Sequence, residues 1–179
     1  MNTVSIKLVA AGDSSKISLL FALKGDRIND RYTPAIFENY TQGYEQDDVK
    51  YSIHLWDTPG QDEYDRLRPI SYHESDVVLL CFALDDRQTL QNVNERWIIE
   101  VKLYCKDAKI ILVGMNSDLR RIGNPNHVSD EEAKQFCIDN GLFEYIPCSA
   151  RTMENINKIF PAVVRACQTK KKHGDCQLI

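Results

Sequence analysis

One short segment combines side chains that suit metal-assisted phosphate chemistry. Asp57, Gly60 and Gln61 stand at the spacing Asp-x-x-Gly-Gln, directly after residues 49–56, whose apolar positions alternate. An aspartate at this place can hold Mg²⁺ through water, and a glycine can offer its N–H to a terminal phosphate and move when that phosphate leaves. A side-chain amide next to them can orient an attacking water. The segment therefore predicts a site in which Asp57 is the metal residue and Gln61 the catalytic residue.

A lysine near the N-terminus stands where it can reach phosphate groups. Residues 5–10 are typical of a short apolar strand and residues 16–23 of a helix, so Lys16 opens a helix after a tight loop. A helix N-terminus presents backbone N–H groups to an anion, and the lysine adds a point charge. We expect phosphate contacts from the loop and the helix start, which comprise Gly12, Asp13, Ser14, Ser15, Lys16, Ile17 and Ser18.

The C-terminal residues predict a membrane anchor. Three lysines, Lys170, Lys171 and Lys172, precede the terminal run that begins at Cys176 and has the form Cys-a-a-X. This form is typical of cysteine prenylation, and the basic cluster supplies the second signal that one lipid needs on an anionic membrane. We expect a prenylated Cys176 in a polybasic tail over residues 170–179.

The elements that must position these residues alternate between strand and helix. This order predicts an α/β fold with a mostly parallel sheet. Residues 41–45 and 49–56 are expected to form a hairpin around Asp47, while residues 77–83 and 109–114 are continuous apolar runs, as in strands covered on both faces.

The last expected helix contains a proline. The helix should span about residues 155–169, and Pro161 within it removes one helical hydrogen bond. We therefore expect a kink or a late start. Residues 1–169 are expected to form one domain.

Composition sets broad bounds. The 179 residues suffice for one domain with a sizeable core, and the hydrophobic fraction of 43% is ordinary for a globular protein. The net charge of −4 gives no reason to expect a nucleic-acid partner. The six cysteines form no Cys-x-x-Cys pair, so reduced thiols are expected rather than a zinc or redox site.

The segment from Trp56 to Tyr72 closely resembles the second switch of Rho-family small GTPases, including the Trp before the Asp and the Tyr-Asp-Arg-Leu-Arg-Pro run. The resemblance covers about residues 4–179. It implies a P-loop α/β domain of the Ras superfamily, over residues 1–169, with a six-stranded mixed sheet, helices on both faces and GTP or GDP as cofactor. Asp118 and Ser149 are too close in sequence for the Rho insert helix, which should be shortened or absent.

The same resemblance places a base site and an effector loop. Asp118 stands where the family's aspartate accepts the guanine N1–H and N2–H, while Asn116 replaces the lysine that covers the base. Ser149 and Ala150 match the Ser-Ala loop, whose Ala backbone N–H would bind guanine O6. The implied effector-binding residues are Tyr32, Ile36, Phe37, Glu38, Asn39 and Tyr40.

The chain departs from the family where Mg²⁺ is held. Ile17 replaces a hydroxyl ligand, Ala35 replaces the first-switch threonine, and Ser15 replaces a loop glycine. Ser18 would supply a hydroxyl only if the helix start moved by one residue, and Thr33 only if it projected to the same side. Weak or absent Mg²⁺ binding and slow hydrolysis are therefore expected.

Two functions fit these residues. The first is a membrane-tethered, Rho-like guanine-nucleotide-binding signalling protein whose intrinsic GTPase activity is low or absent. It would bind effector and regulator proteins of the actin cytoskeleton or of polarity through both switches, at the cytoplasmic face of membranes, the plasma membrane above all, and in the cytosol. The second is a pseudo-GTPase adaptor that binds such proteins without nucleotide-driven switching. An unrelated flavodoxin-like binding protein is disfavoured by the second-switch match.

Overall fold

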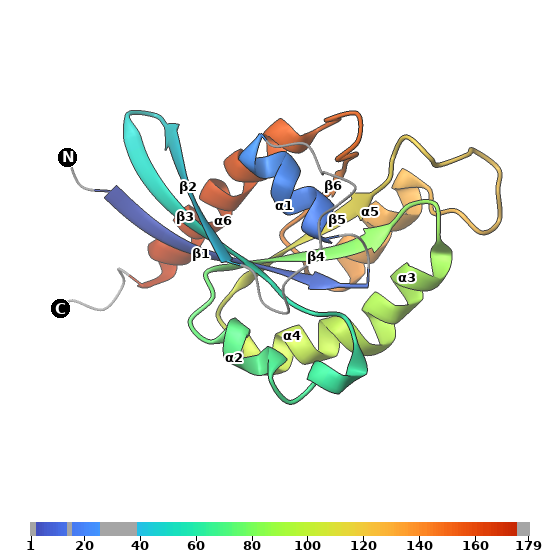
Figure 1. The fold of residues 1–179 in the computed structure, drawn as a ribbon, viewed down its shortest axis with the longest axis horizontal. Coiled ribbons are helices and arrows are strands. Elements are labelled where there is room, and N and C mark those ends of the chain that lie inside the picture. The colour runs from blue at the N-terminus through green and yellow to red at the C-terminus, as the bar shows by residue number, and fades with distance from the viewer. Residues whose placement is uncertain (1–2, 14–15, 26–38, 175–179) are drawn as a thin grey trace.

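The structure is a computed structural model that describes residues 3–13, 16–25 and 39–174 (Figure 1). A six-stranded sheet has the spatial order β2-β3-β1-β4-β5-β6, in which β2 and β3 are antiparallel and all other neighbours are parallel. The strands are β1 Thr3–Gly12, β2 Asn39–Gln46, β3 Val49–Asp57, β4 Val77–Ala83, β5 Lys109–Met115 and β6 Glu144–Pro147. The expected six-stranded mixed sheet is thus confirmed.

Helices cover both faces of the sheet. Residues of α1 and α6 pack on one face, and residues of α3, η2, α4 and α5 pack on the other (Figure 1). The α-helices are α1 Lys16–Lys24, α2 Arg68–Tyr72, α3 Arg87–Asn92, α4 Ile98–Tyr104, α5 Asp130–Asp139 and α6 Ile159–Gly174. The other helical segments are the 3-10 turns η1 Asp62–Tyr64 and η3 Ile156–Lys158 and the π-helical turn η2 Val93–Trp97. All seven residues of β4 are buried, because apolar side chains meet helices on either side.

The hairpin between β2 and β3 forms where it was expected. Asp47 and Asp48 have φ values of 51° and 62°, as in a type I′ turn, which suits the twist of two adjoining antiparallel strands. The pairing starts at Asn39, opposite Trp56, so the hairpin is longer than residues 41–45 alone indicate.

The last helix starts late, as Pro161 requires. The 3-10 turn η3 precedes α6, and Pro161 lies in the first turn of α6, where a missing N–H breaks no helical bond. The helix continues to Gly174, which corrects the expected end at residue 169. Within the described ranges, no helix has the length and apolarity needed to cross a bilayer.

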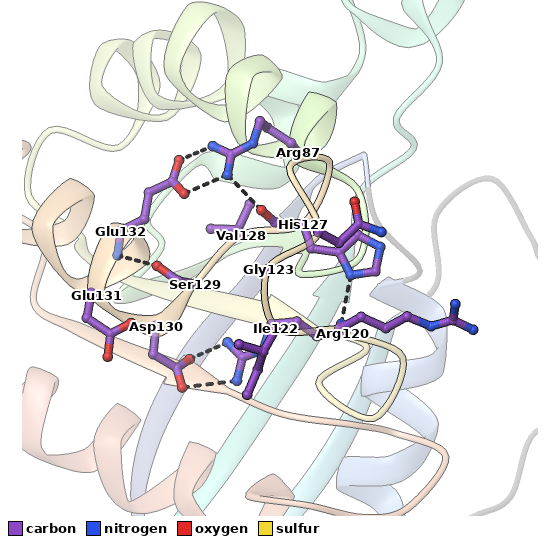
Figure 2. Close-up of a pocket in the computed structure, with 12 residues that line it drawn as sticks. Arg87, Arg120, Ile122, Gly123, His127, Val128, Ser129, Asp130, Glu131 and Glu132 are labelled. Atoms are coloured by element: carbon purple, nitrogen blue, oxygen red, sulfur yellow. Dashed lines mark hydrogen bonds and ion pairs between the residues drawn. The ribbon is translucent and has the colours of Figure 1, made fainter.

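The segment between β5 and α5 holds no helix. Residues 116–129, all of them described, form turns and irregular backbone, so the Rho insert helix is absent from this part of the chain. A cavity of about 540 Å³ lies beside the start of α5. Figure 2 shows two ion pairs among its side chains, Arg87 with Glu132 and Arg120 with Asp130. None of the residues expected in the functional site lines this cavity.

Candidate nucleotide-binding site

The end of β1 requires a glycine. Gly12 has a φ of +124°, and a Cβ built on it would lie 2.1 Å from the carbonyl oxygen of Cys81 on β4. Any side chain there would push β1 and β4 apart. The start of the expected phosphate loop is therefore set directly against the central strand of the sheet.

Lys16 lies at the same C-terminal end of β1, together with Gly60 of the second switch. Its side chain is almost fully buried, and Nζ donates a hydrogen bond of 2.6 Å to the carbonyl oxygen of Gly12. A Cβ built on Gly60 would lie 3.8 Å from Lys16 Nζ and 3.5 Å from the same carbonyl oxygen. Burial lowers the pKa of Lys16 in spite of the nearby Asp57, Cys81 and Asp13. The residues thus form a compact group around a desolvated ammonium, which an anionic ligand would stabilise.

The first residues of the second switch are fixed to β1. The Thr58 N–H donates to Asp57 Oδ1 at 2.9 Å, and the buried Thr58 hydroxyl donates to the carbonyl oxygen of Ala10 at 2.7 Å. Asp57 itself pairs with Ala10 in the β1–β3 register. The carboxylate expected to face a metal ion is therefore held at the C-terminal ends of two adjacent parallel strands.

The rest of the second switch is held by Arg68. The side chain is fully buried and donates to both carboxylate oxygens of Glu100 on α4, from Nε at 2.7 Å and from Nη2 at 3.1 Å. Its Nη1 donates to the carbonyl oxygens of Pro59, at 2.6 Å, and Gln61, at 3.4 Å. Tyr72 donates to the same Glu100 at 2.7 Å. One guanidinium thus ties the backbone on both sides of Gly60 to the helix behind it.

Asp13 connects the phosphate loop to α3 and η2, which lead directly into α4. Trp97 Nε1 donates to Asp13 Oδ1 at 2.9 Å, and Asn92 Nδ2 donates to Asp13 Oδ2 at 2.5 Å. The Trp97 ring also lies beside the guanidinium carbon of Arg68, at 4.7 Å from the ring centroid. Trp97, in the π-helical turn η2, therefore contacts both Asp13 of the phosphate loop and Arg68, which holds the second switch.

The expected base-site residues meet at the C-terminal ends of β5 and β6. Ser117 N–H donates to the carbonyl oxygen of Cys148, and Cys148 N–H donates to that of Gly114, which joins the two loops. Asn116 has a left-handed φ of 61° and donates from Nδ2 to Asp85 Oδ1 at 3.0 Å.

Asp118 is held by the loop after β6. Arg151 donates to Asp118 Oδ2 from Nε at 2.8 Å and from Nη2 at 2.5 Å. Burial alone would raise the pKa of Asp118, but hydrogen bonds from Ser149 and Arg151 outweigh it and hold the pKa below its usual range. Asp118 is therefore ionised at neutral pH and ready to accept hydrogen bonds.

A family model described as the Ras family matches residues 7–169. The chain belongs to the Ras family of small GTPases. Its fold is accordingly the Ras-like P-loop GTPase fold, and Ras-family proteins in general bind guanine nucleotide, Mg²⁺, effectors and regulators.

The structure of this Ras-family chain gathers the expected residues into two groups. Gly12, Lys16, Asp57 and Gly60 meet beside β1, and a second group, Asn116, Asp118, Ser149 and Ala150, lies after β5 and β6. Gln61 is exposed and extended, with φ −71° and ψ 145°. The side chains of Ile17 and Ser18 are half-buried in the first turn of α1.

Part of the expected effector loop is described. Asn39 and Tyr40 begin β2, and the Lys24 ammonium lies 4.2 Å from the centroid of the Tyr40 ring. The expected site residues outside the described ranges are Ser14, Ser15, Tyr32, Ile36, Phe37, Glu38 and Cys176.

Sequence reasoning missed three side chains of this Ras-family site. Arg68 lies inside the quoted second-switch segment and Trp97 on the expected helix, yet neither was assigned a contact. Arg151 directly follows Ser149 and Ala150, so a cation beside the base loop was the available signal.

Proposed function

We propose that this Ras-family chain is a Rho-like, membrane-tethered signalling protein that binds guanine nucleotide through a weakened phosphate and metal site. The approach of Gly60 to Lys16 and Gly12 carries the proposal, because it brings second switch and phosphate loop to one buried ammonium. The Rho-like assignment is supported by the residues from Trp56 to Tyr72, and Trp56 itself lies under the Lys7 ammonium.

The residues suit the phosphates better than the metal ion. Lys16 supplies charge at the helix start, whereas Ile17, one residue further on, has no oxygen to offer. Mg²⁺ requires near-ideal octahedral oxygen geometry, so Asp57, acting through water, would hold it weakly. Bound Mg²⁺ would neutralise charge on the β- and γ-phosphates. If Mg²⁺ binds weakly, this charge is poorly neutralised, and GTP hydrolysis would be slow even with Gln61 present to orient the water.

The tethering part of the proposal rests on the tail. Cys176 begins a Cys-a-a-X terminus, and Lys170, Lys171 and Lys172 precede it. A prenyl group and a basic cluster together give stable attachment to an anionic membrane surface. With both, the protein would reside at the cytoplasmic face of the plasma membrane, with a further share in the cytosol. Effectors of the actin cytoskeleton or of polarity would be the partners there.

The second candidate is a pseudo-GTPase adaptor, and the Arg68 contacts favour it. The guanidinium holds the carbonyl oxygens of Pro59 and Gln61 and the Glu100 carboxylate at once, through contacts within the chain alone. A second switch fixed in this way would present one protein-binding surface in all states.

Nucleotide content separates the two candidates. The full chain is purified without added nucleotide and denatured, and the supernatant is analysed for GDP and GTP. We expect substoichiometric GDP, which is lost in Lys16→Ala but retained in the control Lys50→Ala, a variant of an exposed lysine on β3. If the wild type contained no nucleotide and did not bind added GDP at millimolar concentration, the nucleotide-binding candidate would be excluded and the adaptor would remain.

A further inference from the structure

Arg151 occupies the acceptor that a guanine base would use. The guanidinium Nε and Nη2 both donate to Asp118 Oδ2, at 2.8 and 2.5 Å. The Asp118 side chain is 11% exposed while that of Arg151 is 72% exposed. The carboxylate is therefore part of the site wall, and the arginine approaches it from the solvent side, as a ligand does.

The two donors have the form of the guanine edge. In arginine, Nε–H and Nη–H project from nitrogens on one carbon, and in guanine the N1–H and N2–H donors likewise flank one carbon. Both groups are planar forks that fit a carboxylate. Here both arginine donors converge on one oxygen, whereas a guanine edge placed bidentately would engage both oxygens of Asp118. Guanidinium and base therefore compete for the same acceptor, and the base has the better geometry.

We propose that Arg151 is an internal competitor for guanine at Asp118, and so determines how tightly the site takes a guanine nucleotide. The inference rests on the proposed function, since it concerns the same base site. The protein would bind guanine only in the fraction of molecules in which Arg151 has left Asp118. Observed affinity then equals intrinsic affinity multiplied by that fraction.

The exposure of Arg151 makes the competitor displaceable. No hydrogen bond or ion pair other than the one to Asp118 holds its guanidinium among the described residues, so nothing else opposes its departure. An ion pair whose arginine is mostly exposed contributes little, and the corresponding reduction in nucleotide affinity is about two- to fivefold. Salt screens such a pair, so the reduction should shrink as ionic strength rises.

The neighbouring loop contacts keep the carboxylate in place when the arginine leaves. Ser149 is buried and hydrogen-bonds Asp118, and its own Oγ accepts from the Thr152 N–H at 3.1 Å. The Ser149 N–H donates to the carbonyl oxygen of Glu154. Removal of the Arg151 guanidinium should therefore free Asp118 without disordering the loop.

The test compares Arg151→Gln with wild type by isothermal titration with GDP and with ADP. Adenine lacks the N1–H and N2–H donor pair and has no use for a freed Asp118 carboxylate. We expect GDP to bind about two- to fivefold tighter to the variant, with ADP binding unchanged. Arg165→Gln is the matched control, because Arg165 is also exposed and pairs with one carboxylate, Glu144, at 2.6 Å on β6.

A second measurement needs no nucleotide. The pKa of Asp118, followed by NMR in the nucleotide-free protein, should rise in Arg151→Gln, since the arginine helps to hold it low. An unchanged Asp118 pKa, or GDP binding that is equal or weaker in Arg151→Gln, would overturn the inference while leaving the proposed function intact. A failure of GDP to bind either wild type or Arg151→Gln would overturn both.

Discussion

Two arginines close on carboxylates at opposite ends of the candidate site, and their surroundings differ. Arg68 is fully buried and holds Glu100 together with two backbone carbonyl oxygens of the second switch. Arg151 is mostly exposed and holds Asp118 alone. The same pair of charged groups therefore makes a permanent clamp at the phosphate end and a displaceable contact at the base end. Burial and the number of partners, rather than residue type, decide which of the two results.

The strongest contrast concerns stability. In Arg68→Met the largely buried Glu100 carboxylate loses its cationic partner and keeps only the hydrogen bond from Tyr72 among the contacts described above. We therefore expect a loss of about 3–5 kcal/mol in the free energy of unfolding. Arg151→Met should cost less than about 1 kcal/mol, because Arg151 itself is mostly exposed and Asp118 keeps its hydrogen bond from Ser149. Chemical denaturation followed by circular dichroism measures both losses. Similar losses in the two variants would show that the clamp and the contact do not differ.

A second experiment concerns the backbone at the phosphate end. Gly12→Ala places a Cβ 2.1 Å from the Cys81 carbonyl oxygen at a φ of +124°, and we expect a loss of about 3 kcal/mol or more. Gly25→Ala is the control, because Gly25 also has a positive φ, of +80°, but open space around it. Its loss should be near 1 kcal/mol. Equal losses in denaturation would mean that the strand contact contributes nothing.

At the phosphate end, nucleotide affinity should improve when ligand hydroxyls are added, whereas at the base end it should improve when the Arg151 guanidinium is removed. Wild-type GDP affinity should change by less than about threefold when EDTA replaces Mg²⁺, because Ile17 and Ala35 carry no ligand oxygen. In the double variant Ile17→Thr with Ala35→Thr, Mg²⁺ should improve GDP affinity by about tenfold, more than the single variants together. Fluorescence titration with labelled GDP measures these ratios. A large EDTA effect in wild type would show that another oxygen holds the ion.

The smallest effect is expected from pH. Burial puts the Lys16 pKa of the nucleotide-free protein below its ordinary 10.5, and bound phosphate would raise it again. Binding therefore takes up a proton between these two values, and GDP affinity should fall as pH rises through that window. The unfolded state also binds more protons there, so stability of the nucleotide-free protein should rise with pH. The prediction would be contradicted if the GDP affinity of the wild type did not change with pH and equalled that of Lys16→Met.

The sequence predicted what depends on local pattern. The apolar run at residues 77–83 became β4, the two aspartates after β2 became the hairpin turn, and Pro161 delayed α6, each for a reason that acts within a few residues. Lys16 and Gly60 were each expected to contact phosphate, and the fold brings them side by side.

Contacts between distant residues were not predictable in this way. The Trp97 indole reaches Asp13 across 84 positions, and Arg151 reaches Asp118 across 33. Each depends on the paths of two separate elements and on competing donors nearby, which no local pattern encodes. The site was therefore foreseen as a set of motifs, and the partners of their side chains came from the fold.

The π-helical turn η2 determines in which direction the side chains of the following helix, α4, face. Ile98 N–H bonds to Val93, five residues back, so the turn holds one residue more than an ordinary helical bond would enclose. One residue corresponds to a rotation of about 100° around a helix axis. Ordinary α-helical bonding of the same residues would therefore turn Glu100 away from Arg68 and disturb the Trp97 contact to Asp13 in one step. Both contacts lie at the phosphate end of the site, and the five residues of η2 hold them in their relative orientation.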